Sequence, residues 1–287
     1  MSIIPIPGFS EPVNAISHLL TAGVFLILAI FTLYKGRGNT ARQLSLLVFS
    51  FFAVALFALS GVYHLLEKGS QASLVLRILD HTAIFTMIAG SFTPFHIILL
   101  RGRSRWLPLL IIWPLAITGL TLTAIFFRSM SEGLLLSFFL AMGWMGIFTV
   151  IRVWTISKSV AQLIVVGALF YTIGALLDYA QWPVLIDGVI GAHELFHFTI
   201  IAAALCHWFA IYNIAYYPLK NELTIVVREF PGQFQAYLFG ENCIAKAPTK
   251  AELMAGLRHW LVRTYPQKLV PEKIRFKFYQ EEWVKLD

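Results

Sequence analysis

Charged residues and cysteines are both scarce in this chain of 287 residues. Only 13% of the residues are charged, whereas a soluble domain has about 25%. Apolar residues make up 58% of the chain, and the mean hydropathy is +0.74. This composition excludes an ordinary soluble globular protein and predicts an integral membrane protein. The two cysteines, Cys206 and Cys243, are too few and too far apart for a disulfide framework.

Two further features are missing from the chain. No tract of basic residues is interleaved with aromatic residues, which excludes nucleic acid as a partner. Residues 1–12 contain no basic residue before their first apolar run and no small-residue cleavage site, so they do not have the pattern of a signal peptide. The first hydrophobic segment is therefore expected to remain in the membrane.

Seven apolar segments are long enough to cross a bilayer, which takes roughly 20 residues per helix. Pro94, Pro108 and Pro114 lie inside the third and fourth segments. Neighbouring helices can satisfy the carbonyl groups that a proline frees in the membrane, so we expect kinks there rather than helix ends. The sequence predicts an all-α bundle of seven transmembrane helices in residues 1–218. The segments cover approximately 14–34, 43–66, 73–100, 105–127, 133–154, 160–180 and 192–217.

After residue 218 the composition changes to that of a soluble module. Residues 219–287 contain eleven Lys or Arg and eight Asp or Glu. Alternating apolar residues on both sides of Pro231-Gly232 predict a β-hairpin, and residues 273–278 alternate as a third strand. Thr249 and Glu252 have the spacing of a capping box that opens a helix. We therefore predict a small soluble α+β domain in residues 219–287.

Basic residues are divided unevenly between the two sides of the membrane. The connections that follow odd-numbered segments carry eight Lys or Arg, compared with three in the even-numbered connections. The positive-inside rule then places the C-terminus in the cytoplasm and the N-terminus outside. The chain is expected to be a multi-pass protein of the plasma membrane or the bacterial inner membrane, with the lipid bilayer as its surroundings.

Histidines gather at the ends of the apolar segments. Counting one crossing per segment places His18, His64, His81, His193 and His197 on the same face of the membrane. Imidazole and carboxylate groups are costly at membrane depth and tend to line cavities or carry function. His193 and His197 are four residues apart, so both point from one helix face with the spacing of a two-point zinc clamp. With His64 as third ligand, the sequence predicts a zinc site of His64, His193 and His197.

Two further polar residues lie on the same face and are the predicted catalytic groups. Asp80, near the start of the third segment, is expected to orient a zinc-bound water and to take its proton. Ser60 lies one helical turn before His64, within reach of the imidazole or of that water.

The remaining polar residues of the segments have other expected places. Glu11, Asn14, His18 and Asp178 are on the same face as the predicted zinc site, and His18 is a candidate for orienting a ligand. His207 is about 15 Å farther along its helix than His197, so we expect it to hydrogen-bond between helices. His96 ends the third segment on the opposite face and is expected at the membrane interface.

These motifs, in this order, resemble those of the haemolysin III / progestin and adipoQ receptor (PAQR) family, which belongs to a wider group with the alkaline ceramidases. The resemblance covers roughly residues 8–217 and depends on Ser60-x-x-x-His64, Asp80 and His193-x-x-x-His197. It implies seven transmembrane helices, a zinc ion on the three histidines, and Asp80 and Ser60 beside its water. Relatives in the wider group hydrolyse amide bonds in lipids such as ceramide, while bacterial members are named for haemolysis or linked to membrane homeostasis.

The predicted function is hydrolysis of a lipid amide or ester bond by a zinc-bound water, with a membrane lipid as substrate. The alternative is a receptor or a membrane-homeostasis protein whose zinc is structural. Two weaker alternatives are an intramembrane metalloprotease and a pore-forming haemolysin. His193-Glu194-x-x-His197 matches the metalloprotease motif in which the glutamate is a general base, but this interpretation leaves His64 and Asp80 unused. The segments also show no polar stripe suited to a water-filled channel.

Overall fold

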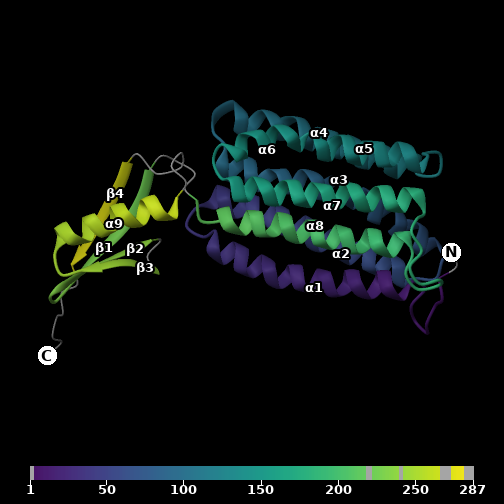
Figure 1. Ribbon diagram of the computed structural model, residues 1–287, viewed down its shortest axis with the longest axis horizontal. Helices are drawn as coiled ribbons and strands as arrows, with labels where there is room; N and C mark the ends of the chain where they lie inside the picture. Colours follow the sequence, from purple (N-terminus) through teal and green to yellow (C-terminus); the bar gives the residue numbers. More distant parts are fainter. Residues whose placement is uncertain (1–2, 218–221, 239–241, 266–272, 281–287) are drawn as a thin grey trace. The chain divides into compact units, whose positions relative to one another are not determined.

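The computed structural model describes residues 3–217, 222–238, 242–265 and 273–280 (Figure 1). The chain divides into two compact units, Met1–Ala215 and Tyr216–Asp287. In the first unit, seven stretches are long and apolar enough to cross a membrane. The second unit contains a small sheet and a helix. The predicted fold class, a seven-helix membrane bundle with a small α+β part, is therefore confirmed.

The seven spans begin and end within a few residues of the predicted segments. Six are single helices, and the fifth is made of α5 and α6, which meet at Met145. Pro94, Pro108 and Pro114 lie inside helices, as predicted. The helices are α1 (Pro12–Lys35), α2 (Thr40–Leu65), α3 (Gln71–Leu99), α4 (Gly102–Phe126), α5 (Glu132–Trp144), α6 (Gly146–Trp154), α7 (Lys158–Ala180) and α8 (Ala192–Ile214).

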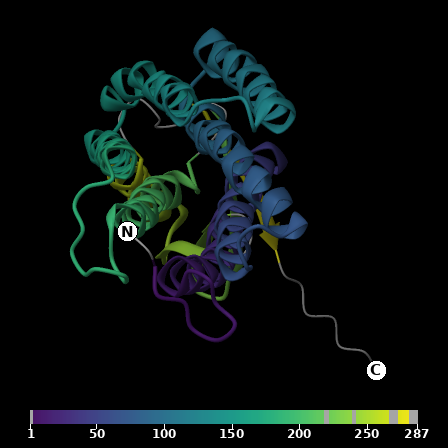
Figure 2. The same cartoon turned by 90° about the vertical axis from the view of Figure 1, so that its right-hand side faces the viewer.

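Helix α3 is the central helix of the bundle. In the most apolar window of α3, 78% of the residues are buried, compared with 22% in α4. Helix α3 contacts α2, α4 and α8, while α8 also packs along α7 and α1. The end-on view in Figure 2 shows α4 at the edge of the bundle. The helices that carry the predicted site residues are α2, α3 and α8, and α3 contacts both of the others.

Glycines allow close approach where the site helices pack. A Cβ atom on Gly61 of α2 would lie 2.9 Å from the backbone nitrogen of Leu19 in α1. A Cβ atom on Gly174 of α7 would lie 1.7 Å from Oγ1 of Thr199 in α8. Real Cβ contacts are longer than this, so larger side chains at these positions would push the helices apart.

The second unit has a four-stranded sheet in the order β3-β2-β1-β4. Strands β1 and β2 form the predicted antiparallel hairpin, with Val227 opposite Ala236. The predicted third strand is β4, which pairs in parallel with β1. Strand β3 was not predicted from the sequence; it adds an edge beside β2. The bounds are β1 (Glu222–Phe230), β2 (Gln233–Leu238), β3 (Asn242–Ala247), α9 (Lys250–Thr264) and β4 (Lys273–Gln280).

Helix α9 begins at the predicted cap, where the Thr249 hydroxyl accepts a hydrogen bond from the backbone N–H of Glu252. Its buried residues, Leu253, Leu257 and Leu261, recur at helical spacing on one face. Residues of β1 and β2 that share one face of the sheet are buried as well, among them Ile225 and Ala236. This unit therefore has an apolar core of its own.

Candidate metal centre

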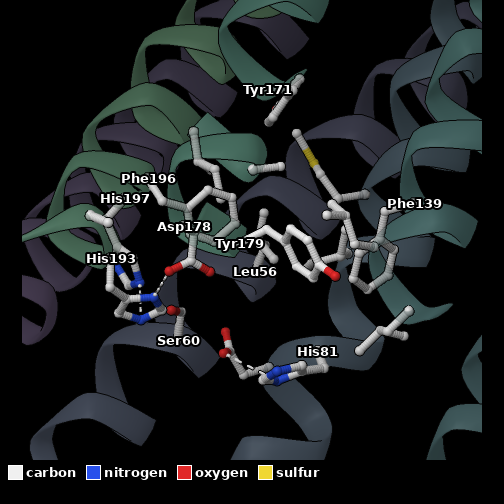
Figure 3. Close-up of a pocket in the computed structure, with 18 of the residues that line it drawn as sticks. Leu56, Ser60, His81, Phe139, Tyr171, Asp178, Tyr179, His193, Phe196 and His197 are labelled. Carbon is white, nitrogen blue, oxygen red and sulfur yellow. Dashed lines mark hydrogen bonds and ion pairs between the residues drawn. The ribbon is translucent and has the colours of Figure 1, made fainter. Parts of the chain in front are cut away.

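The first turns of α8 carry two of the three predicted ligands. His193 and His197 point from the same face, and their Nε2 atoms lie 3.2 Å apart. Figure 3 shows the two rings side by side, with Asp178 reaching toward His193 from α7. Two ring nitrogens at this distance share either a proton or a positive ion, because two lone pairs facing each other repel.

His64, from the last turn of α2, completes the group. One ligand atom from each of His64, His193 and His197 lies within 4.8 Å of the other two, so this cluster could hold a metal ion. His64 and His197 are buried, whereas the side chain of His193 is 40% exposed and lines a cavity. The predicted convergence of three histidines from two separate helices is therefore present in the structure.

Carboxylates orient two of these imidazoles. Nδ1 of His193 is 3.0 Å from Oδ1 of Asp178, and Nδ1 of His64 is hydrogen-bonded to Glu11. A carboxylate accepts, so each Nδ1 carries the proton and each Nε2 keeps its lone pair. Nε2 of His64 is buried and has no hydrogen-bond partner among the described residues. Carboxylate–histidine pairs of this kind are typical outer partners of metal ligands, so the donors fit a metal ion.

Glu11 is fixed beside His64 by the main chain as well. Its backbone N–H donates to the carbonyl oxygen of His64 at 3.0 Å, and its side chain also pairs with Lys68. Burial alone would raise the pKa of Glu11, but the interactions with His64 and Lys68 outweigh burial and lower the pKa below the ordinary value. The main-chain bond and the side-chain bond together place the Glu11 carboxylate against the His64 ring.

Glu194, the glutamate of the His-Glu-x-x-His motif, has both carboxylate oxygens engaged by other residues. Its Oε2 atom accepts from the backbone N–H of Gly191 at 2.8 Å, and its Oε1 accepts from Asn14 at 2.9 Å. The residue is buried, with 2% exposed. These contacts cap α8 and link it to α1. They give Glu194 a structural role and count against the metalloprotease interpretation.

His18 lies directly beside the cluster. Its ring stacks on His197 with a centroid distance of 3.9 Å, and both of its nitrogens are buried without a partner in the described part of the chain. The ring also meets Phe57 edge-on. His18 thus packs against the ring of a candidate ligand and limits its rotation.

The predicted catalytic residues, Asp80 and Ser60, lie near the cluster but outside it. Both line the same cavity as the three histidines. The group of described residues that could hold a metal consists of the three histidines and does not include Asp80. Oδ2 of Asp80 is 3.7 Å from Nδ1 of His81, which itself bonds the carbonyl oxygen of Arg77 at 2.8 Å. Asp80 is 15% exposed and remains accessible from the cavity.

The cavity beside the histidines, here called the central cavity, has a volume of about 540 Å³. Most of its lining comes from α2, α3, α5, α7 and α8, and apolar residues such as Leu56, Ile88, Phe139 and Ile200 make up much of it. Cavities of 300–1,000 Å³ are typical of sites for small organic ligands. The candidate metal centre therefore opens onto a space of suitable size for part of a lipid.

Two other histidines take positions that can be compared with the predictions. His207 bonds between helices as expected, with Nε2 at 3.3 Å from the carbonyl oxygen of Ile164 in α7. His96 lies in the last turn of α3 and is buried; its place at the membrane interface stays a prediction. Its ring nitrogens are bonded to the carbonyl oxygen of Ser104 and the hydroxyl of Thr149. These partners come from α4 and α6, which satisfies the ring inside the bundle.

Sequence reasoning placed Glu11 and Asp178 on the correct face but gave neither of them a role. The available signal was the rule that metal-binding imidazoles donate their second N–H to a carboxylate. That rule calls for acidic residues near the histidines, and these two qualify. Which carboxylate serves which histidine depends on helix packing.

The profile of the family described as "Haemolysin-III related" matches residues 9–208. This chain belongs to the haemolysin III family. The match includes all three histidines of the candidate metal centre as well as Asp80 and Ser60. It ends before the soluble unit, which begins at Tyr216.

Individual relatives agree with this membership in the haemolysin III family. "Hemolysin-3" of Bacillus cereus is 28% identical over 208 residues, covering 70% of this chain and 90% of that protein. A "Hemolysin-3 homolog" of Bacillus subtilis (strain 168) is 30% identical over 208 residues, covering 70% and 92%. "Progestin and adipoQ receptor-like protein 1" of Caenorhabditis elegans is 26% identical over 255 residues, covering 77% and 58%. The resemblance to the haemolysin III / PAQR family is therefore confirmed.

Proposed function

We propose that this membrane protein is a zinc-dependent hydrolase of lipid amide or ester bonds. The observation that carries the proposal is the opening of the three-histidine cluster onto the central cavity, which has an apolar lining. A metal centre and an apolar space side by side suit a substrate that has a polar carbonyl group and a long hydrocarbon chain.

We infer that the metal is zinc, because its catalytic sites commonly have this donor set. Three imidazoles with one coordination position left for water or substrate are a common arrangement in catalytic zinc sites. Here His64, His193 and His197 would hold the ion, with Glu11 and Asp178 orienting two of the rings. When bound, zinc would lower the pKa of a water toward about 7 and polarise a carbonyl group.

The chain's own residues would supply proton transfer and substrate binding. Asp80, which lines the same cavity, would act as the general base that removes a proton from the attacking water and returns it to the leaving group. Ser60 lines the cavity one turn from His64 and can hydrogen-bond the carbonyl or the water. The apolar lining would take up the hydrocarbon chain and keep bulk water away from the carbonyl.

Metal content and hydrolysis measured together test this proposal. Purified protein in lipid nanodiscs should hold zinc and release fatty acid from some member of a panel of ceramides, N-acyl amines and glycerol esters. His64→Ala, His193→Ala and His197→Ala should each lose most of the metal and the turnover. His207→Ala, in the same helix as two of the ligands, is the matched control and should keep its zinc.

Two outcomes would contradict this view. Full zinc retention by His64→Ala would show that the ion does not depend on the cluster of three histidines. Stoichiometric zinc without turnover of any lipid in the panel would favour the alternative of a receptor or homeostasis protein with a structural zinc.

A further inference from the structure

The sheet of the second unit has one face that its helix covers and one that it does not. Helix α9 packs against β2 and β3 and buries three leucines. On the covered face of the sheet, Ile225 and Val227 of β1 and Ala236 of β2 are buried. Successive side chains of a strand point to opposite faces, so the residues between these lie on the other face of the sheet, here called the open face.

Strand pairing gathers four basic residues and two tyrosines on the open face. Arg228 of β1 pairs with Tyr279 of β4, and at the preceding open-face position Val226 pairs with Lys277. Residues that pair across two strands share a face, so the register determines which side chains belong to this set. Its basic and aromatic members are Arg228, Lys246, Arg275, Lys277, Tyr237 and Tyr279.

The charges of the open face are accessible. Lys246, Arg275 and Lys277 are exposed, and Tyr279 is 52% exposed. The guanidinium group of Arg228 lies over the ring of Tyr237, 5.1 Å from its centroid. No Asp or Glu is among the described side chains on this face. The open face is therefore positively charged and carries aromatic rings beside its charges.

An anionic membrane surface matches these properties. Lys and Arg are attracted to anionic lipid headgroups, and tyrosine rings favour the level of the headgroups. The bundle unit ends at Ala215 and the second unit begins at Tyr216, so no long linker separates the unit from a membrane-spanning helix. A short connection gives an intramolecular partner a high effective concentration, so a modest attraction to the bilayer is sufficient.

We propose that the open face docks on the anionic phospholipid headgroups of the membrane that holds the bundle, with its four basic residues contacting the phosphate groups. The partner is the cytoplasmic leaflet, which has a negative surface potential. That leaflet is on the side predicted for the C-terminus. Docking holds the second unit against the bilayer, and a bilayer without anionic lipid releases it. The inference depends neither on zinc nor on hydrolysis.

Full-length protein in lipid nanodiscs tests this docking. Cys243 is exposed and pairs with Tyr237, so it lies on the open face. In a Cys206→Ser background, a small fluorescent label on Cys243 should be quenched by a trace of lipid with a nitroxide on its headgroup. We expect strong quenching in discs of equal parts phosphatidylcholine and phosphatidylglycerol, and weak quenching in phosphatidylcholine alone. Added salt should reduce the quenching, because it screens exposed charges.

A label on the other side of the unit is the reference. Ala255 is exposed on α9, and a label on Ala255→Cys, in a background without the two native cysteines, should show weak quenching in both kinds of disc. Equal quenching at positions 243 and 255 would contradict docking through the open face.

Charge removal identifies the residues involved. Arg275→Gln combined with Lys277→Gln should lower the docking equilibrium constant roughly 25-fold, since each basic residue near an anionic surface contributes about fivefold. Arg258→Gln combined with Arg263→Gln removes the same charge from exposed positions of α9. This control should dock like the wild type.

Two further results would overturn the proposal. One is equal quenching at Cys243 in the two kinds of disc, or an equal loss of docking in the two double variants. The other is a single-stranded oligonucleotide that changes the fluorescence of the Cys243 label in phosphatidylcholine discs and no longer does so in the variant with Arg275→Gln and Lys277→Gln. That result, without preferential quenching in phosphatidylglycerol discs, would assign the open face to nucleic acid.

Discussion

At the scale of single residues, the candidate metal centre is organised by hydrogen bonds to the ring nitrogens that face away from it. Asp178 holds His193, and Glu11 holds His64. Each bond selects the tautomer in which Nε2 is free to bind a metal ion. The side chains that would contact an ion therefore depend for their orientation on Asp178 and Glu11, which would not contact it.

This dependence predicts an effect of Asp178→Asn. The amide keeps the size of the side chain but loses the charge that favours the Nδ1–H tautomer of His193, so zinc affinity should fall about 10–100-fold. Titration with a zinc chelator measures the change. Asp187→Asn, at an exposed position of the loop before α8, is the matched control and should leave the affinity as it is. An unchanged affinity in Asp178→Asn would mean that the ion does not use His193 in this tautomer.

Asp80 is predicted to act on the water rather than on the metal. Asp80→Asn keeps the shape but removes the base, so hydrolysis should slow by about 10²–10⁴ while the zinc content stays near normal. Metal analysis and initial rates on the same preparation separate the two effects. If Asp80→Asn loses its zinc as completely as the histidine variants, Asp80 is a ligand and the structural-zinc alternative gains support.

At the scale of elements, the site depends on how closely the helices approach. Helix α2 delivers His64 one turn after Gly61, whose Cα lies against the backbone of α1. Helix α8 is capped by Glu194 and tied to α1 through Asn14. The positions of the histidine rings are therefore coupled to helix packing.

A pair of glycine substitutions tests this coupling. Gly61→Ala places a methyl group 2.9 Å from the Leu19 nitrogen, and the overpacking should destabilise the bundle by about 1–3 kcal/mol. Gly23→Ala, in α1, meets nothing within 4 Å and should stabilise its helix by roughly 0.5–1 kcal/mol. Thermal unfolding in detergent should show shifts of Tm in opposite directions. Equal shifts would show that the close approach at Gly61 does not matter for stability.

At the scale of the whole molecule, a membrane bundle and a soluble unit are joined in one chain. The family match covers residues 9–208, so the candidate metal centre belongs to the part shared with the relatives. In membrane proteins an excess of Lys and Arg marks the cytoplasmic connections, and the orientation predicted for this bundle depends on that rule.

We predict that the soluble unit is cytoplasmic. Cys243 is exposed, whereas Cys206 lies half-buried within α8. In a Cys206→Ser background, a thiol reagent that does not cross membranes should label Cys243 in inside-out vesicles and not in right-side-out vesicles. An added Cys at Ser2 should show the reverse. Labelling of Cys243 from outside would mean that the loop charges do not control the orientation.

The seven spans and the three clustered histidines could be predicted from the sequence alone. The spans can be predicted from hydropathy because each segment must itself be apolar over roughly 20 residues to cross the bilayer. The separation of His193 and His197 follows from the helical period, and the common face of these two and His64 follows from counting crossings.

The tertiary structure decided which groups meet. The break at Met145, the partners of His96 and the edge strand β3 depend on neighbours distant in sequence. The same is true of the pairs that orient the imidazoles. Glu194, next to His193 in the chain, faces Asn14, while Asp178 from another helix bonds His193. Local spacing places a side chain on a helix face, but the approach of another helix decides what that face contacts, because hydrogen bonds need their atoms within about 3 Å.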